Sequence, residues 1–198
     1  MEGQHPIVIS SEMNMKKYDY WFWENLVNEN EIKQINLICE KNNESSFTDN
    51  NATAVLKTAE VRGIYWKFLK PKIFHVENIW REKNKEQFGF NIYQILDIDV
   101  WNFNIYDSKN QGQYEYHYDG TTNHISDIKL TGIVNISDES YEGGELIAFY
   151  NGEFKEIPQI KNPGSAVLLS QKTLHKVNPV TKGIRKTLSV WYYGPKFI

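Results

Sequence analysis

The sequence predicts an α+β domain in which N-terminal helices brace a sheet built from the rest of the chain. Two observations lead to this prediction. Residues 1–88 contain apolar positions spaced by three and four, which are typical of amphipathic helices. From Gly89 onward, short runs rich in strand-forming residues alternate with turn signals dense in Gly, Asn, Asp and Pro. We find no composition break that divides residues 1–198, so we expect a single domain with helical support in 1–88 and a strand-rich core in 89–198.

Two helices are expected in the first part of the chain. Asn28 offers helix-start chemistry, and one apolar face follows it at Ile32, Ile35, Ile38 and Cys39. A second helical region covers about residues 64–87. Pro71 lies inside it and should kink the helix or divide it in two, because proline lacks the amide hydrogen. The polar residues 43–53 are expected to form a loop.

Eight strands are expected in the second part of the chain. They are NIYQI (91–95), DVWNFNIYD (99–107), QYEYHYD (113–119), KLTGIVNIS (129–137), GELIAFY (144–150), EFKEI (153–157), SAVLLS (165–170) and RKTLSVWYY (185–193). Short strands separated by turns favour an antiparallel sandwich or barrel, such as a jelly roll.

The overall composition argues against several classes of function. The formal net charge is -3, and no basic block is present that would neutralise nucleic-acid phosphates. No window approaches the roughly 18 apolar residues that a membrane span requires. The only cysteine, Cys39, rules out an intramolecular disulfide and is expected as core filler rather than as a nucleophile. Since Met1–Ser10 also lacks the features of a signal peptide, we expect a soluble protein in a reducing, cytoplasmic compartment.

The sequence His117-Tyr118-Asp119 stands at the end of a predicted strand. Side chains alternate along a strand, so His117 and Asp119 point the same way and can share one cation. His175, which follows the strand 165–170, is a candidate third ligand. Two histidines and one carboxylate form the facial arrangement of non-haem Fe(II) oxygenases, although zinc accepts the same ligands.

Arg185 lies beyond the turn that follows His175. If this turn makes a hairpin-like reversal, the strand 185–193 returns alongside the end that carries His175. Alternation then places Arg185, Thr187, Ser189 and Trp191 on one face, with Leu188 and Val190 on the other. An inward guanidinium needs an anionic partner, which a carboxylate ligand would supply, whereas an arginine on an exposed strand pair would need none.

The stretch from about Val100 to Trp191 resembles the prolyl 4-hydroxylase-like branch of the 2-oxoglutarate/Fe(II) dioxygenases. The matching pieces are NIYDSKNQGQYEYHYD, LTGIVNISDESYEGGELIAF and NPGSAVLLSQKTLHKVNPVTKGIRKTLSVWYYG. This resemblance covers nearly half of the chain, and KTAEVRGIYWKFL matches more loosely. It implies a double-stranded β-helix, or jelly roll, where the residues alone indicate only an α+β fold.

The resemblance also implies roles for individual residues. His117, Asp119 and His175 match the iron ligands, and Arg185 matches the residue that pairs with the distal carboxylate of 2-oxoglutarate. Tyr106 matches a tyrosine that bonds the same carboxylate. The implied cofactors are Fe(II), 2-oxoglutarate and O2, with ascorbate as a candidate reductant.

Further residues are expected around the pocket. Trp191 matches an aromatic that lines it, and Thr187 lies on the same face. Arg62, Tyr65 and Trp66 are expected at a lid or rim, because a loop in this part of related enzymes closes over the substrate.

The implied reaction is the hydroxylation of an unactivated C–H bond with release of succinate and CO2. The expected substrate is a prolyl residue of a protein or peptide, and a free amino acid or small metabolite is the alternative. Two rivals come from other classes: a non-catalytic jelly-roll binding module, and a cupin-like metalloenzyme that uses zinc or manganese without an oxo-acid. Arg185 and Tyr106 discriminate against the second rival, which needs no carboxylate anchor.

Overall fold

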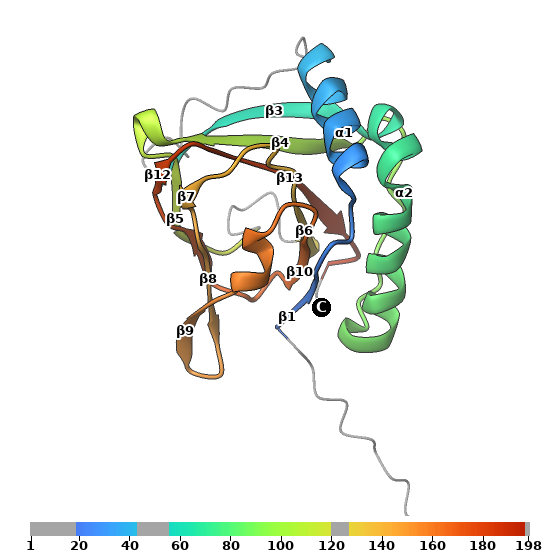
Figure 1. Ribbon diagram of the computed structural model, residues 1–198. Helices are drawn as coiled ribbons and strands as arrows, with labels where there is room; N and C mark the ends of the chain where they lie inside the picture. Colours follow the sequence, from blue (N-terminus) through green and yellow to red (C-terminus); the bar gives the residue numbers. More distant parts are fainter. Residues whose placement is uncertain (1–18, 43–55, 120–126, 197–198) are drawn as a thin grey trace, which may run out of the picture.

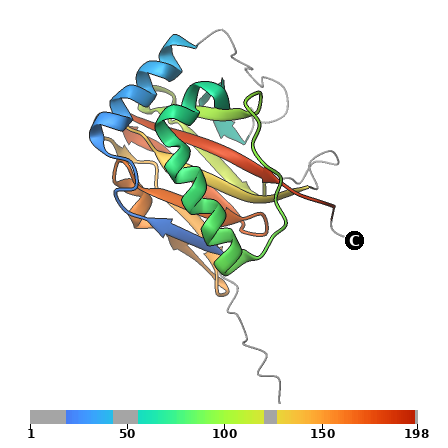
Figure 2. The ribbon, with the colours of Figure 1, turned by 90° about the vertical axis from the view of Figure 1, so that its right-hand side faces the viewer.

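The computed structural model of the protein describes residues 19–42, 56–119 and 127–196, and it is built from two facing sheets and two long helices (Figures 1 and 2). The six-stranded sheet has the order β1 (Tyr20–Trp23), β10 (Ala166–Ser170), β6 (Ile128–Asn135), β13 (Ile184–Tyr193), β4 (Val100–Asp107) and β3 (Glu60–Tyr65). The five-stranded sheet has the order β2 (Lys57–Thr58), β5 (Gln113–His117), β11 (His175–Val177), β8 (Leu146–Tyr150) and β9 (Glu153–Glu156). A small pair joins β12 (Val180–Lys182) to β7 (Glu142–Gly143).

All pairings in these sheets are antiparallel. Two antiparallel sheets that face each other, with helices on the outer side of one, form the jelly roll that the resemblance implies. The expected α+β fold is therefore confirmed. Short helical turns complete the chain, namely the π-helical η2 (Asn84–Phe88) and the 3-10 turns η3 (Ser108–Asn110) and η4 (Pro158–Lys161).

Helix α1 (Glu29–Lys41) begins where the sequence predicts. The amide of Glu31 donates to the side chain of Asn28 at 3.0 Å, and the amide of Asn28 donates to the carboxylate of Glu31 at 2.9 Å. This reciprocal pair satisfies amides that a helix start leaves without partners. Cys39 lies on the buried face of this helix, as expected.

Helix α2 (Trp66–Lys83) covers the six-stranded sheet and runs unbroken through Pro71, so of the two expected outcomes, a kink or a division into two helices, the division is wrong. Burial explains why one lost backbone bond is tolerated: Leu69, Ile73 and Val76 are fully buried against the sheet, and each buried side chain of this size stabilises by about 1.5–3 kcal/mol. Trp66 and Trp80 of α2 stack on Trp101 of β4, with ring centroids 5.0 and 5.9 Å apart.

Two other expectations are corrected. Residues 91–95 do not form a strand, and the expected helical part of the chain also contributes β1, β2 and β3. These three strands exist because β10, β5 and β4 offer free edges to them, which is a tertiary effect. Neither of the two long helices in the described ranges is apolar enough over sufficient length to cross a membrane.

Strand β13 positions the pocket. Arg185, Thr187, Ser189 and Trp191 all line the cavity between the sheets, whereas Leu188 and Val190 belong to the core shared with the helices. The alternation expected for this strand is thus confirmed. The expected hairpin is wrong, because β13 pairs with β4 and β6 while β11, which carries His175, pairs with β5 and β8. Arg185 therefore reaches the site from the opposite sheet.

Candidate active site

A cavity of ≈ 310 Å³ lies between the two sheets and contains every residue proposed as a ligand from the sequence. The five-stranded sheet and the residues after it contribute His117, Asp119 and His175. The six-stranded sheet contributes Tyr106, Arg185, Thr187 and Trp191.

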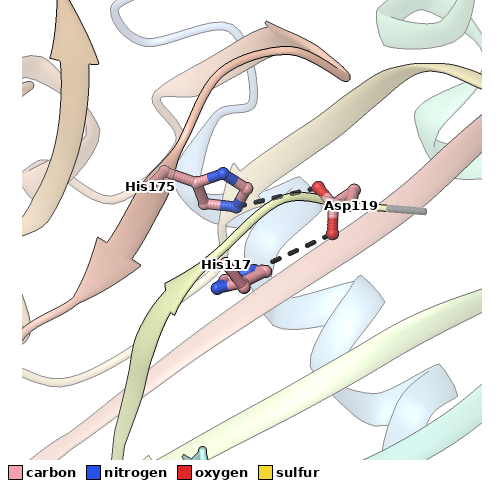
Figure 3. Close-up of side chains that lie close together, drawn as sticks. All are labelled: His117, Asp119 and His175. Carbon is pink, nitrogen blue, oxygen red and sulfur yellow. Dashed lines mark ion pairs between the residues drawn. The ribbon is translucent and has the colours of Figure 1, made fainter. Parts of the chain in front are cut away.

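Three possible metal ligands converge at one end of this cavity (Figure 3). His117 and His175 are direct partners across β5 and β11, so their side chains leave the sheet on the same face. Asp119 follows two residues after the end of β5. Its carboxylate lies 3.8 Å from Nε2 of His117 and 3.7 Å from Nε2 of His175, and the ligand atoms of all three lie within 4.8 Å of one another.

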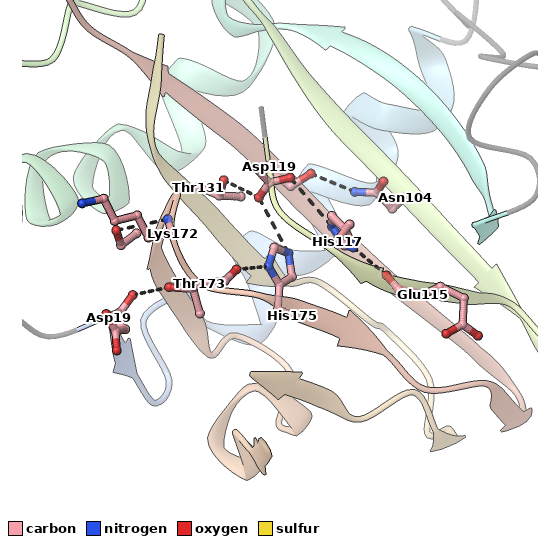
Figure 4. A network of polar contacts seen from close by, with 11 residues as sticks. Asp19, Asn104, Glu115, His117, Asp119, Thr131, Lys172, Thr173 and His175 are labelled. Atoms are coloured by element: carbon pink, nitrogen blue, oxygen red, sulfur yellow. Dashed lines mark hydrogen bonds and ion pairs between the residues drawn. The ribbon is translucent and has the colours of Figure 1, made fainter. Parts of the chain in front are cut away.

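Hydrogen bonds orient each of these side chains (Figure 4). Nδ1 of His117 lies 2.7 Å from the carbonyl oxygen of Glu115, and Nδ1 of His175 lies 2.9 Å from that of Thr173. A carbonyl only accepts, so each Nδ1 carries the proton and each Nε2 presents its lone pair to the shared centre. The hydroxyl of Thr131 donates to Oδ2 of Asp119 at 2.6 Å. The set therefore fits a divalent metal such as Fe(II).

The surroundings of His117 keep its imidazole neutral. Burial, followed by the neighbouring His175, lowers the pKa of His117 to about 4, although Asp119 acts in the opposite direction. The ring of Tyr114 stacks on the imidazole at a centroid distance of 3.6 Å and an interplanar angle of 15°. A neutral, immobilised imidazole is the form that binds a metal.

Arg185 lies in the same cavity, opposite the metal ligands, and is 1% exposed. Tyr106 is its direct partner on β4, and the guanidinium carbon lies 5.2 Å from the centre of the tyrosine ring. Burial raises the pKa of the Tyr106 hydroxyl, while the charge of Arg185 and a hydrogen bond from it partly oppose this increase.

Some hydrogen-bond donors of Arg185 lack acceptors among the residues that the structure describes. Its Nε and Nη2 are buried and have no hydrogen-bond partner among the residues that the structure describes. A buried cation with unused donors is costly, and a carboxylate that accepts two parallel bonds would satisfy it. The pocket therefore fits an acid such as 2-oxoglutarate, one carboxylate of which would satisfy these donors.

Gly144 leaves space at this end of the pocket. From the sequence alone, the pair Gly143-Gly144 indicates only a turn. A Cβ atom at Gly144 would lie 2.9 Å from Cδ of Arg185 and 3.0 Å from Cγ2 of Val180. Gly144 also has a φ of +68°, a region that favours glycine. The absent side chain thus leaves the space that the arm of Arg185 occupies.

Other neighbours were not found from the sequence. Thr131 is one of three buried polar or charged residues of β6, with Lys129 and Asn135, so nothing in the sequence distinguishes it. Lys57 gives no local signal; it reaches the cavity because β2 pairs with β5, and its Nζ donates to Oδ1 of Asn104 at 2.7 Å. Asn104 in turn lies 3.4 Å from the hydroxyl of Thr187.

None of the three expected rim residues lines the cavity. Trp66 is 2% exposed and stacks in the core beside Trp101, so its expected place at a lid is wrong. Arg62 and Tyr65 are partly exposed on β3 but do not line the cavity, whereas Glu60 and Val61 of the same strand do. The expected loop 43–53 lies outside the described residues.

Comparison with known proteins agrees with this geometry. The family model described as the 2OG-Fe(II) oxygenase superfamily matches residues 101–193, a segment that includes all three metal-ligand candidates, Arg185 and Tyr106. This segment, just under half of the chain, is thus similar to that superfamily. A segment of the chain is also 36% identical over 96 residues to the PKHD-type hydroxylase YbiX of Escherichia coli, an alignment that covers 45% of the chain and 40% of the relative. The chain spans well under half the length of the curated relatives that it matches.

Solved structures share this jelly-roll fold over most of the chain. A prolyl-4-hydroxylase from Pseudomonas putida has a TM-score of 0.69 at 13% identity, and the alignment covers 90% of this chain and 94% of the other. A prolyl hydroxylase from Trichoplax adhaerens, solved with a hypoxia inducible factor peptide fragment, has a TM-score of 0.68 at 12% identity, with 88% and 83% covered. At such identities these similarities establish the fold.

Proposed function

We propose that the protein is an Fe(II)- and 2-oxoglutarate-dependent dioxygenase. His117, Asp119 and His175 hold the iron, and Arg185 with Tyr106 binds the distal carboxylate of the oxo-acid. The observation that carries this proposal is the buried guanidinium with two unused donors, which faces a His-Asp-His cluster across one cavity. A metalloenzyme without an oxo-acid would have no use for that cation, and neither would a jelly roll that serves only as a scaffold.

The protein's own residues prepare the reaction. The two carbonyl acceptors hold the imidazoles with Nε2 inward, and Thr131 fixes the orientation of Asp119. Arg185 neutralises the distal carboxylate inside a site shielded from water, where the attraction is stronger than in solvent. When bound, iron and 2-oxoglutarate supply the chemistry that uses O2 to hydroxylate a C–H bond, with release of succinate and CO2.

The substrate proposed for this site is a prolyl residue of a protein or peptide. The prolyl hydroxylases among the fold relatives support this choice, and one of them was solved with a peptide fragment. A pool of proline-containing peptides should gain the mass of one oxygen, detected by mass spectrometry, only when Fe(II) and 2-oxoglutarate are both present. Production of succinate without modification of any peptide would direct the search to free amino acids and small metabolites.

Anaerobic titration of the metal-free protein tests the cofactor assignment. Fe(II) followed by 2-oxoglutarate should produce a visible charge-transfer band that requires both. Arg185→Ala should bind iron as before and weaken 2-oxoglutarate binding by about tenfold or more, because charge-assisted hydrogen bonds are lost. Lys182→Ala, which removes an exposed cation from β12, is the control and should leave both affinities unchanged. Equal affinities in the two variants would contradict the role of Arg185.

A further inference from the structure

A second cavity opens beside the metal pocket, where two strands of the six-stranded sheet separate. The pairing of β4 with β13 runs from Ile184↔Asp107 to Ser189↔Asn102 and stops there, although β13 continues to Tyr193. A cavity of ≈ 490 Å³ occupies this divergence. We call it the slot, and its walls include Tyr93, Leu96, Ile98, Val100, Trp191 and Tyr193.

The slot lies next to the metal pocket and shares two lining residues with it. Asn102 and Trp191 line both cavities, one from β4 and one from β13. The pocket-facing row of β13 runs outward from Arg185 past Trp191 and ends at Tyr193 in the slot. Burial raises the pKa of Tyr193, and the charges of Asp99 and Asp119 act in the same direction.

The slot presents apolar side chains to solvent. Tyr93 is 57% exposed, Leu96 55%, Ile98 71% and Tyr193 42%. Four large apolar groups around one cavity differ from the isolated exposed residues that are normal on protein surfaces, and such groupings mark binding sites.

Hydrogen bonds fix the segment of residues 93–99, which lines one side of the slot. The amide of Tyr93 donates to the carbonyl of Tyr193 at 2.8 Å, and Arg81 donates to the carbonyl of Tyr93 at 2.9 Å. Nearer the metal pocket, the amide of Leu96 donates to the carboxylate of Asp99 at 2.7 Å. The carbonyl of Asp99 accepts from the first amide of α2, at Trp66, also at 2.7 Å. The segment is thus fixed at both ends, and the site is formed before a ligand arrives.

We infer that the slot binds apolar side chains that flank the hydroxylated residue of a peptide substrate. This inference rests on the proposed function and narrows its substrate class. A free amino acid that places its reacting side chain at the metal has no neighbouring residues to extend from the pocket of ≈ 310 Å³ into the slot. A peptide continues from that side chain past Trp191 and can bury apolar neighbours in the slot.

A fluorescent label placed in the slot tests this binding without any turnover. Cys39 is fully buried, so a cysteine introduced by Ile98→Cys is the only reactive thiol expected for an environment-sensitive dye. Leu37→Cys, on the outer face of α1 and 65% exposed, is the matched control. The probes are two pools of nonapeptides with a central proline, one with leucine and isoleucine flanks and one with aspartate flanks.

The apolar pool should shift the emission of the Ile98 label saturably and leave the Leu37 label unchanged, and the acidic pool should shift neither. Equal responses to both pools, or at both labels, would overturn the inference. A shift that depends on protein concentration without peptide would also overturn it, because the slot would then bind a second copy of the chain.

Hydroxylation of the same pools provides the second test. Ile98→Asp should lower kcat/KM for apolar-flanked peptides by about tenfold, whereas Leu37→Asp should not change it. The 2-oxoglutarate band should be the same in both variants. If no peptide is hydroxylated while the Ile98 label still responds to the apolar pool, the proposal of prolyl hydroxylation is wrong. The binding of apolar peptides in the slot is then still supported. If the Ile98 label does not respond although the peptides are hydroxylated, only the inference that the slot binds the peptide is wrong.

Discussion

Replacement of Gly144 by alanine tests how strongly 2-oxoglutarate binding depends on the position of the Arg185 guanidinium. The new Cβ atom would lie 2.9 Å from Cδ of Arg185, where ordinary van der Waals contacts begin at 3.4 Å. The arginine arm must therefore move by roughly 0.5 Å or more away from its present line. Arg185 stays charged and buried, so the change alters the direction of its donors and not their number.

The magnitude has two parts. Alanine at a φ of +68° is strained, which costs about 1–2 kcal/mol of stability. In addition, one misdirected charge-assisted hydrogen bond loses about 1.5–3 kcal/mol. The second part appears only in ligand binding, and it corresponds to an increase of about tenfold to a hundredfold in the Kd for 2-oxoglutarate.

The chain offers a control for the first part alone. Gly152 has a φ of +83°, and a Cβ atom there would meet nothing within 4 Å. Gly152→Ala should therefore lower the thermal unfolding midpoint to a similar degree without changing the Kd. Calorimetry of both variants with Fe(II) and 2-oxoglutarate separates the two effects. Equal Kd values in Gly144→Ala and Gly152→Ala would refute the reasoning.

Three further predictions concern metal binding, packing and the thiol. Thr131→Val removes the donor to Oδ2 of Asp119 and should weaken Fe(II) binding about 10–100-fold in a competition titration; unchanged affinity would show that the hydroxyl is dispensable. Gly132→Ala places a Cβ 2.1 Å from the ring of Trp80 and should destabilise the fold by about 1–3 kcal/mol in denaturant titration, so an unchanged midpoint would contradict this close approach. Burial raises the pKa of Cys39 to about 12, so the thiol should resist a disulfide reagent at pH 8 until urea unfolds the protein; prompt reaction of the native protein would exclude this burial.

The sequence was most informative where local pattern and tertiary structure agree. The cap at Asn28 and the alternation along β13 depend on neighbouring residues alone, and both were predictable. Residues 91–95 contain strand-forming residues between turn signals, yet they form no strand, and Tyr93, Gln94 and Ile95 line the slot. Their pattern could not reveal that β4 and β13 diverge at that place.

The site was predictable in its residues but not in its architecture. The strand position of His117 placed Asp119 beside it, and His175 was a plausible third ligand. The assignment of Arg185 to the same hairpin failed because the turn after His175 carries the chain from one sheet to the other. Lys57 reaches the cavity through a strand of two residues that forms only by pairing with β5.

The division of the site between two layers has a consequence for the persistence of the folded protein. His117 and His175 belong to one sheet and Arg185 to the other, so a ligand that contacts both joins the layers across the core. Such a ligand has no binding site in the unfolded chain. At a hundredfold excess over its Kd it adds about 2.7 kcal/mol to the free energy of unfolding. The resistance of the folded protein to thermal unfolding and to proteolysis would then increase with the concentration of this ligand.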